Sequence, residues 1–467
     1  MTGMINMKSS IFFKNKYYFY ILALVILVFF IFVYFSYTEK INEEEFFLNR
    51  SLNRLNAEVD VILNTYNVTA DAVYNNIINK KDIKRLIYYG WNIKNRRDNY
   101  RIYLKEQLKP LYNNLKDYQI RQLHVHFKDG TSFLRMHRPD RYGDNLFKVR
   151  EGVKYVNTKK EEFVGFEEGR IFNGYRYIYP LSYQGEHIGS VEISISFEAV
   201  TQLLSENLGG AKELIIKNNI VKNKVFAEEQ ANYKQTSFID NYSYDLKIHQ
   251  KSVQTNNEVD NNIIRQVNKD NKEKIQQEIK TGNSFIVFTK VNGNFYTGSF
   301  INVRGINGKT KAYMVSYQKN EALNFINHKF RLTIFLSLIF LILTVILLSI
   351  IFSNNNRLRY LANNDQLTQI SNRRHLTSVL EREYERNQRY DSTFSFIIFD
   401  IDHFKEVNDN YGHDVGDNIL REMSSLVENN IRKNDYFGRW GGEEFVVIAA
   451  AADIEVAEKF AEKLRKI

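Results

Sequence analysis

The sequence predicts a multidomain α/β protein in which two transmembrane helices flank an outer region and a further α/β domain follows the second helix. Three observations lead to this prediction. Two apolar runs carry no charge, the region between them starts with a heptad pattern and continues with strand patterns, and a new series of strand and helix patterns follows the second run. A chain of 467 residues is long enough for two or three domains.

Residues 17–37 and 331–353 are the two predicted membrane spans. Tyr17 to Tyr37 and Leu332 to Ser353 are free of charged side chains, and about 20 apolar residues cross the hydrocarbon core as a helix. The alternatives are a cleaved signal peptide for the first run and a buried core helix for the second. No small-residue cleavage site follows the first run, and the second stays uncharged for longer than core helices do, so we favour two spans.

Flanking charges predict the orientation, because basic residues collect on the cytoplasmic side. The basic residues next to the spans are Lys8, Lys14, Lys16, Arg357, Arg359, Arg373 and Arg374, whereas Glu39, Glu43, Glu44 and Glu45 follow the first span. We expect a multi-pass protein of the bacterial inner (cell) membrane, in contact with lipid. Residues 1–16 are then a cytoplasmic N-terminus, residues 38–330 lie outside the cytoplasm, and residues 354–364 are a cytoplasmic signalling linker.

Composition excludes several classes of site. The net charge is +10, but no basic cluster with interleaved aromatic residues occurs, so we expect no nucleic-acid partner. The chain has no cysteine, which excludes disulfides, thiolate metal sites and cysteine nucleophiles.

The outer region begins with a long helix. Apolar residues recur at alternating spacings of four and three, an a/d pattern over several heptads; they are Leu48, Leu52, Leu55, Val59, Ile62, Tyr66, Ala70, Val73 and Ile77. Packing onto its own domain and packing against a second copy are equally favoured, and both can hold along different halves.

Strand patterns then predict two lobes. The first contains a hairpin over 122–138 about Asp129-Gly130 and a half-buried strand marked by Val191, Ile193, Ile195 and Phe197. The second begins near Leu214. Its predicted strands are 284–290, 295–303 and 310–318, with turns at Asn292-Gly293 and Asn307-Gly308.

A two-residue turn in the hairpin pairs Val125 with Leu134 and His124 with Arg135. Period-two alternation then puts His124, His126, Arg135 and His137 on one face with Phe133 among them, and Leu123, Val125, Phe127, Leu134 and Met136 on the other. The basic face fits a small anion with Arg135 as bidentate donor. A solvated strand face is equally favoured. A metal on the two histidines is a third option, but no carboxylate is placed to complete it.

The stretch from His124 to Pro139, with Tyr142-Gly143-Asp144, resembles a double Cache sensor domain. The resemblance is local. It implies that residues 38–330 are a Cache-like sensor for an unknown small extracytoplasmic ligand.

The C-terminal region contains an ordered series of motifs. Asp365-Gln366-Leu367-Thr368 and Asn372-Arg373-Arg374 precede a predicted helix over 375–389, and the apolar run Phe394–Phe399 predicts a strand buried on both faces. Asp400-Ile401-Asp402 follows, with two carboxylates on one side, as an oxygen site for a hard cation requires. In isolation, two solvated turn aspartates would be the better interpretation.

Further motifs follow at Phe404-Lys405, Asn408-Asp409, Tyr411 to Asp414 and Gly416-Asp417, and then a helix is predicted over 418–430. Arg439-Trp440-Gly441-Gly442-Glu443-Glu444-Phe445 leads into a strand. Two glycines at a hairpin tip allow the backbone to approach a phosphate closely, and Glu443 adds a hard oxygen ligand.

From Asp365 to the last residue these motifs resemble the GGDEF family in its GGEEF form. The resemblance implies a palm-like α/β domain over 365–467 and a diguanylate cyclase that, as a homodimer, condenses two GTP into cyclic di-GMP. It implies two Mg²⁺ (or Mn²⁺) per site on Asp400, the Ile401 carbonyl and Glu443. It implies guanine contacts from Asn408 and Asp417, and triphosphate contacts from Phe404, Lys405, Gly441 and Gly442. Glu444 would lie nearest the 3′-hydroxyl, so Asp400, Glu443 and Glu444 form the implied catalytic set.

Arg432 and Asp435 match the family's RxxD pattern for inhibition by the product, although an isolated RxxD is more often a surface ion pair. The chain ends at Ile467, inside a helix that begins near Glu455, whereas the family continues. We therefore expect a C-terminally incomplete (truncated) domain of little activity. The alternative function is an inactive receptor that binds cyclic di-GMP at the RxxD site. A chemoreceptor-like transducer is disfavoured because no long coiled coil follows the second span.

Overall fold

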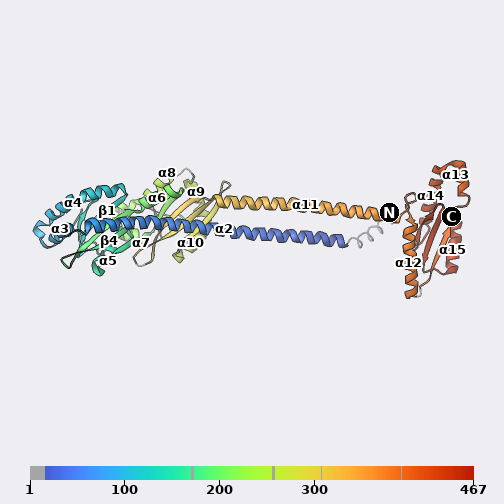
Figure 1. Cartoon of the computed structure of the whole chain (residues 1–467), viewed down its shortest axis with the longest axis horizontal. Coiled ribbons are helices and arrows are strands. Elements are labelled where there is room, and N and C mark those ends of the chain that lie inside the picture. The colour runs from blue at the N-terminus through green and yellow to red at the C-terminus, as the bar shows by residue number, and fades with distance from the viewer. Residues whose placement is uncertain (1–15, 170–172, 255–257, 307, 391) are drawn as a thin grey trace. The chain divides into compact units, whose positions relative to one another are not determined.

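The computed structural model describes residues 16–169, 173–254, 258–306, 308–390 and 392–467. Lys8, Lys14 and Asn307, which entered the predictions above, lie outside the described residues. Two compact units are described separately: residues 33–334, and the described residues of 1–32 with 335–467. Helices and strands carry the labels of Figure 1.

Two helices contain the uncharged runs. α2 spans Lys16–Val73 and α11 spans Glu321–Asn363, and the most apolar stretch of each has no buried side chain. By length and composition each is able to cross a membrane. α11 continues through residues 354–363, so most of the linker is helical.

The C-terminal half of α2 packs onto its own domain. Its buried side chains follow the expected heptad positions; they are Leu55, Val59, Ile62, Ala70 and Val73. The Tyr177 hydroxyl donates to the Leu63 carbonyl at 2.7 Å, and the helix runs alongside both lobes (Figure 1). Of the two alternatives for the heptad seam, packing onto the own domain holds along this half, and a short π-helix, Tyr74–Ile78, follows.

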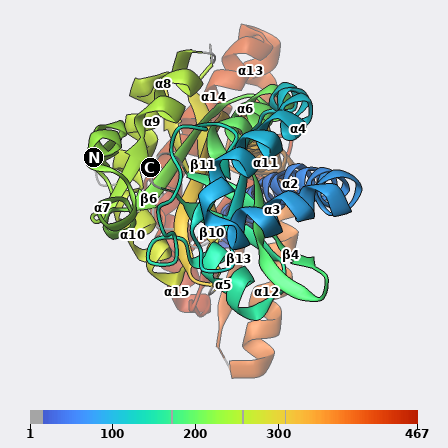
Figure 2. The same ribbon diagram turned by 90° about the vertical axis from the view of Figure 1, so that its left-hand side faces the viewer.

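The first lobe is a five-stranded antiparallel sheet in the order β2-β1-β5-β4-β3. Its strands are β1 (Ile120–Phe127), β2 (Ser132–Arg135), β3 (Phe163–Glu168), β4 (Asn173–Tyr183) and β5 (Glu186–Ser196). Helices α3 (Lys81–Asn92) and α4 (Arg97–Asp117) lie side by side against one face (Figure 2). Helix α5 (Glu151–Lys159) covers the other face, where Val153 and Val156 pack on Ile178.

The prediction of a half-buried strand is wrong for β5. This strand lies between β1 and β4 with both faces covered, so the alternate polar residues Ser190, Glu192 and Ser194 are buried as completely as the apolar ones. Phe197 begins helix α6 (Phe197–Leu208). Alternation in sequence does not distinguish a solvent face from a buried polar face.

The second lobe is a six-stranded sheet in the order β7-β8-β6-β11-β10-β9. Its strands are β6 (Ala211–Lys217), β7 (Tyr233–Gln235), β8 (Tyr242–Asp245), β9 (Phe285–Val291), β10 (Asn294–Arg304) and β11 (Thr310–Lys319). Its helices are α7 (Asn218–Lys224), α8 (Leu246–Gln254), α9 (Asn261–Asp270) and α10 (Lys272–Thr281). Asn292 and Gly293 both have positive φ, 49° and 86°, as the expected tight turn requires.

The C-terminal domain is a four-stranded sheet in the order β12-β14-β15-β13 with helices around it. Its strands are β12 (Ser371–Asn372), β13 (Phe394–Phe399), β14 (Tyr436–Gly441) and β15 (Glu444–Ala450). Its helices are α12 (Arg373–Tyr390), α13 (Phe404–Tyr411), α14 (His413–Glu428) and α15 (Ile454–Arg465).

The continuous apolar run of β13 predicted a strand that is buried on both faces. This prediction is wrong. Within the described residues β13 is an edge strand with β15 as its sheet neighbour, and Phe396 and Ile398 are 41% and 52% exposed. Phe399, on the other face, stacks on Phe437 and Phe445 in the core.

Candidate functional site

The sheet of the C-terminal domain brings the acidic motif residues to one end. β13 and β15 are antiparallel, and Phe399 pairs with Phe445. Asp400 directly follows β13 and Glu444 begins β15, so the two acidic residues lie at the same end of this strand pair. Asp400 and Glu444 are exposed and Glu443 is half-buried, so their oxygens can be approached from solvent.

The β14–β15 hairpin holds the two glycines at its tip. Gly442 has a φ of +51°, which favours glycine, and no atom lies within 4 Å of where a Cβ of Gly441 or Gly442 would be. The Arg439 guanidinium links this turn to the start of the domain. Its Nε donates to the Gly442 carbonyl at 2.7 Å, and its Nη1 donates to the Asp365 carboxylate at 3.2 Å. Partial burial acts to raise the pKa of the Asp365 carboxyl, but hydrogen bonds from Thr368 and Arg439 outweigh it and lower that pKa.

Helices α13 and α14 bring the predicted guanine-binding residues together. Gly416 contacts Asn408 so closely that a Cβ there would lie 2.0 Å from Asn408 Oδ1, and Asp417 is the next residue on α14. Phe404 is buried under this helix pair, whereas Lys405 beside it is exposed. The close approach explains why a glycine stands at position 416.

Arg432 and Asp435 lie in the turn before β14. The Asp435 carboxylate accepts from the backbone nitrogens of Arg432 at 3.3 Å and Ala450 at 3.2 Å. Arg432 is exposed, and among the described residues no ion pair joins its guanidinium to Asp435.

The first lobe holds a second candidate site, a cavity of about 370 Å³ on the α5 face of the sheet. Its described lining includes Gln122, His124, Arg135, His137, Asp140, Arg141, Tyr142, Asp144, Arg150 and Arg176. All four sensor residues expected from the sequence lie at or beside this cavity. Three line it directly, and His126 stands 4.0 Å from His124, ring centre to ring centre.

The hairpin register agrees with the prediction at His124↔Arg135 and Val125↔Leu134. It then shifts by one residue, so that His126 pairs with Ser132, and the predicted two-residue turn is wrong. Because one step of register turns a side chain to the opposite face, Ser132 and not Phe133 lies beside the histidines. Phe133 packs on Phe127 in the core, with ring centres 4.4 Å apart.

The predicted bidentate donor, Arg135, is already engaged. Its two terminal nitrogens donate to the Asp144 carboxylate at 2.7 and 2.9 Å, and Nη1 also donates to the Arg141 carbonyl. Arg135 is 9% exposed, so the interpretation of its strand as a solvated face is wrong.

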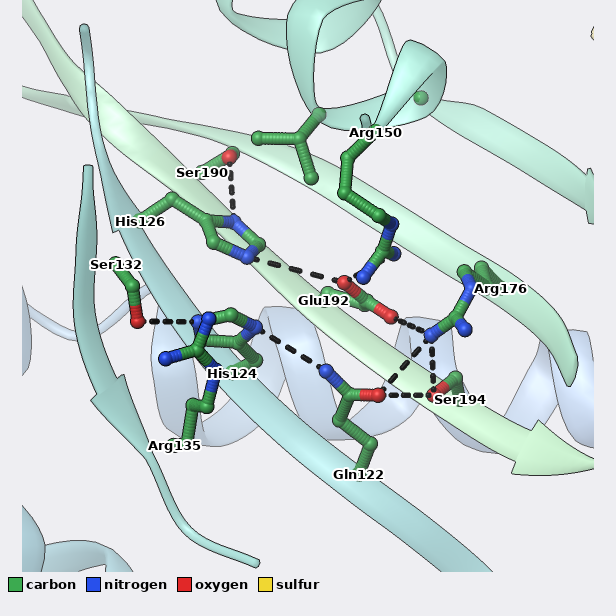
Figure 3. Close-up of polar contacts among 12 residues, drawn as sticks. Gln122, His124, His126, Ser132, Arg135, Arg150, Arg176, Ser190, Glu192 and Ser194 are labelled. Atoms are coloured by element: carbon green, nitrogen blue, oxygen red, sulfur yellow. Dashed lines mark hydrogen bonds and ion pairs between the residues drawn. The ribbon is translucent and has the colours of Figure 1, made fainter. Parts of the chain in front are cut away.

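Two buried arginines and two buried glutamates form the centre of the polar face, and Figure 3 shows Arg150 and Arg176 beside Glu192. Arg150 donates to Glu167 at 2.8 Å and to Glu192 at 2.7 Å, and Arg176 donates to the other oxygen of Glu192. Burial acts to raise the pKa of the Glu192 carboxyl, but both arginines outweigh it and hold that pKa far below its usual range. Sequence reasoning missed all four residues, because they come from four separate segments.

The two hairpin histidines are buried and neutral. Burial lowers the pKa of His126 to about 3, with Glu192 opposing that shift only in part. Burial likewise lowers the pKa of His124 well below its usual value. Ser132 and Ser190 hold the outer nitrogens of the two rings at 2.8 and 3.0 Å.

A carboxylate does complete the histidine pair, contrary to the sequence prediction. β5 pairs with β1 so that Glu192 stands directly opposite His124, and one ligand atom each of His124, His126 and Glu192 lie within 4.8 Å of one another. The hairpin pattern alone held no information on this neighbour.

A family model described as "Diguanylate cyclase, GGDEF domain" matches residues 362–467. These residues are a GGDEF domain. A second model, "Double sensory domain of two-component sensor kinase", matches residues 59–237, which contain the whole first lobe. The chain is thus a multidomain α/β protein that joins a Cache-type sensor to a GGDEF domain.

Curated relatives match short segments of this chain. Diguanylate cyclase DosC of Escherichia coli (strain K12) is 39% identical over 85 residues, 18% of this chain and 18% of that protein. Diguanylate cyclase DgcP of Pseudomonas aeruginosa is 38% identical over 86 residues, 18% and 13% of the two chains. Uncharacterized protein YtrP of Bacillus subtilis is 46% identical over 69 residues, 15% and 12%. The chain spans less than a fifth of the length of these relatives.

Solved structures match as well. The coiled coil and GGDEF domain of DgcB from Caulobacter crescentus, in complex with c-di-GMP, is 26% identical and covers 26% of this chain and 63% of that one, with a TM-score of 0.25. The active GGEEF domain of a diguanylate cyclase from Vibrio cholerae is 37% identical, covers 20% and 61%, and has a TM-score of 0.20.

The ion network of the sensor generates a stability prediction. Glu192→Gln keeps the shape of the side chain but leaves Arg150 and Arg176 without their shared counter-charge, so we expect a loss of about 3–5 kcal/mol, seen as earlier thermal unfolding. The native pKa is depressed, so this contribution is fully present above the ordinary Glu range and shrinks as the pH falls below it.

The matched control is Glu186→Gln, at the exposed start of the same strand, which should unfold like the wild type. Equal unfolding temperatures for Glu192→Gln and Glu186→Gln at neutral pH would show that the network adds no stability.

Proposed function

We propose that this protein is a membrane sensor diguanylate cyclase that condenses two GTP into cyclic di-GMP and two pyrophosphates, gated by a small extracytoplasmic ligand. The observation that carries the proposal is the complete set of acidic, guanine-side and glycine motifs at one end of the GGDEF sheet. The similarity to the diguanylate cyclases DosC and DgcP supports it.

The site residues have distinct proposed roles. Asp400, the Ile401 carbonyl and Glu443 offer only oxygen donors, which fits two Mg²⁺ or Mn²⁺ ions. Such ions neutralise phosphate charge and lower the pKa of a hydroxyl. Asn408 and Asp417 bind the guanine edge, while Phe404, Lys405 and the open backbone at Gly441-Gly442 bind the triphosphate.

Glu444 orients the 3′-hydroxyl that attacks the α-phosphorus of the second GTP. Each domain holds one nucleotide, so the reaction needs a homodimer that brings two sites face to face. Holding both reactants in place removes several kcal/mol of barrier, on the order of 7–11 in favourable cases.

We propose further that α2 and α11 cross the cell membrane, with the sensor outside and the GGDEF domain in the cytoplasm. The uncharged, unburied apolar stretches support this topology, as do the basic residues Arg357 and Arg359 after the second stretch.

Catalysis is tested by Asp400→Ala and Glu444→Ala in the purified full-length membrane protein with GTP and Mg²⁺. We expect each to lower cyclic di-GMP formation by about 100-fold or more, because a charge-stabilising group of the transition state is lost. Glu422→Ala, an exposed glutamate on α14, is the control and should keep wild-type turnover. Wild-type product formation by both site variants would overturn the assignment.

Feedback is tested by Arg432→Ala. We propose that Arg432 and Asp435 bind the product, so the substitution should weaken inhibition by cyclic di-GMP about tenfold while turnover stays near wild type, as expected for one charge-assisted hydrogen bond. The neighbouring Lys433→Ala is the control and should be inhibited normally. Product binding at Arg432 without turnover in the wild type would favour the inactive-receptor function instead.

The gating ligand is proposed to be a small anion in the first-lobe cavity. The carboxylates of Glu167 and Glu192 hold Arg150 and Arg176 and do not line the cavity, so both guanidinium groups face it. The lining also contains two carboxylates, Asp140 and Asp144, and Asp144 is paired with Arg135. No described residue accepts from Nη1 of Arg150. Arg135, His124, His126 and His137 complete the surroundings of the proposed ligand.

A screen of small carboxylates for a rise in unfolding temperature of the purified protein tests this proposal. Arg141→Ala removes an exposed cavity cation and should reduce the rise, whereas Arg138→Ala, outside the described cavity lining, should not. If no anion raises the wild-type unfolding temperature, or if Arg141→Ala responds like the wild type, the cavity is not an anion site.

A further inference from the structure

We propose that the first lobe binds a late first-row transition-metal ion, of which Zn²⁺ is representative, through His124, His126 and Glu192. The three residues come from adjacent strands β1 and β5 (Figure 3), and His124 also lines the cavity. This site is separate from the Mg²⁺ site proposed for the GGDEF domain.

The spacing of the ligand atoms fits one shared ion. His126 Nε2 and Glu192 Oε2 are 3.8 Å apart, which is too long for a hydrogen bond. Two ligands at about 2.0–2.1 Å from a tetrahedral Zn²⁺ lie roughly 3.4 Å apart, and a wider bond angle increases this distance. The third ligand residue, His124, is within the same 4.8 Å group.

His126 leaves a nitrogen without a hydrogen bond. Its Nε2 is buried and has no hydrogen-bond partner among the described residues, although buried polar atoms normally have one. The orientation of the His126 ring is fixed, because Nδ1 forms a hydrogen bond with the Ser190 hydroxyl at 3.0 Å. Asn157 in turn donates to that hydroxyl at 2.8 Å. A metal ligand is typically fixed in this way through its other nitrogen.

The hydrogen bonds of His124 determine which nitrogen is available. Arg176 donates to Gln122 Oε1, so the amide nitrogen of Gln122 faces His124 Nδ1 at 3.1 Å and must donate. His124 Nδ1 is therefore the acceptor, and Nε2 carries the proton toward Ser132. An ion takes the place of the Gln122 hydrogen bond and coordinates the Nδ1 lone pair.

The two arginines on Glu192 limit which ions bind. Arg150 and Arg176 both lie on this carboxylate and repel a dication. Mg²⁺ and Ca²⁺ rely on carboxylate charge and are excluded, whereas Zn²⁺, Ni²⁺ and Cu²⁺ gain enough from two imidazole nitrogens. Gln122 and His124 also line the cavity, so an ion has an entry path and an open position that water or a small anion can fill.

The test measures Zn²⁺ and Co²⁺ binding to the tag-free, chelator-stripped protein, with Mg²⁺ present to occupy oxygen sites. We expect one tight site per chain, and a visible Co²⁺ spectrum typical of nitrogen and oxygen ligands in a low-coordinate site. His126→Gln removes the Nε2 ligand and should weaken binding by about 100-fold or more and abolish that spectrum.

The control is His187→Gln, a half-buried histidine of the same lobe that lies outside the ligand group, and it should bind like the wild type. Circular dichroism checks that His126→Gln is folded. If it is not, His124→Gln serves as the second variant, with the same expected loss. Equal binding by folded wild type and ligand variants, or no stoichiometric Zn²⁺ binding by the wild type, would overturn the proposal.

Discussion

The sensor lobe depends on one buried arrangement, in which the Glu192 carboxylate lies between the guanidinium groups of Arg150 and Arg176. Charges are expensive to bury unless they are paired, so this group fixes how α5, β4 and β5 meet. It also keeps the carboxylates of Glu167 and Glu192 out of the cavity wall, whereas Arg150 and Arg176 line it together with Asp140 and Asp144.

The same arrangement explains why two histidines lie inside a protein and stay neutral. The arginines nearby add to the effect of burial, so protonation at ordinary pH is unfavourable, and the imidazole lone pairs remain available. The GGDEF domain uses the opposite design. Its acidic residues Asp400 and Glu444 stand exposed at the end of a sheet, so their carboxylates remain in contact with solvent.

Much of the structure follows from the sequence where the signal is local. The hairpin pattern gave the correct partners for His124 and Val125, although the predicted two-residue turn is wrong and a register shift after Val125 compensates for it. In the GGDEF domain, Asn408 contacts Gly416, the residue before Asp417. The failures share a cause. A bulge after Val125 turned Phe133 into the core, and alternation in β5 predicted solvent where polar neighbours lie, because the residues that bury Glu192 come from β4 and from the start of α5. The residue pattern of one strand does not indicate which residues of other strands and helices pack against it.

Helix α2 packs against both lobes of the sensor, through a core cluster that includes Leu55 and Ile62 with Leu214 and Met314 of the second sheet. A continuous α-helix neither stretches nor shortens appreciably, because every turn is closed by backbone hydrogen bonds. Helix α2 therefore keeps the two lobes at a fixed separation. The lobes cannot move apart unless the apolar side of α2 leaves the core and becomes exposed to solvent. The motions of low energetic cost are a rotation of a lobe about the axis of α2 and a small translation along that axis.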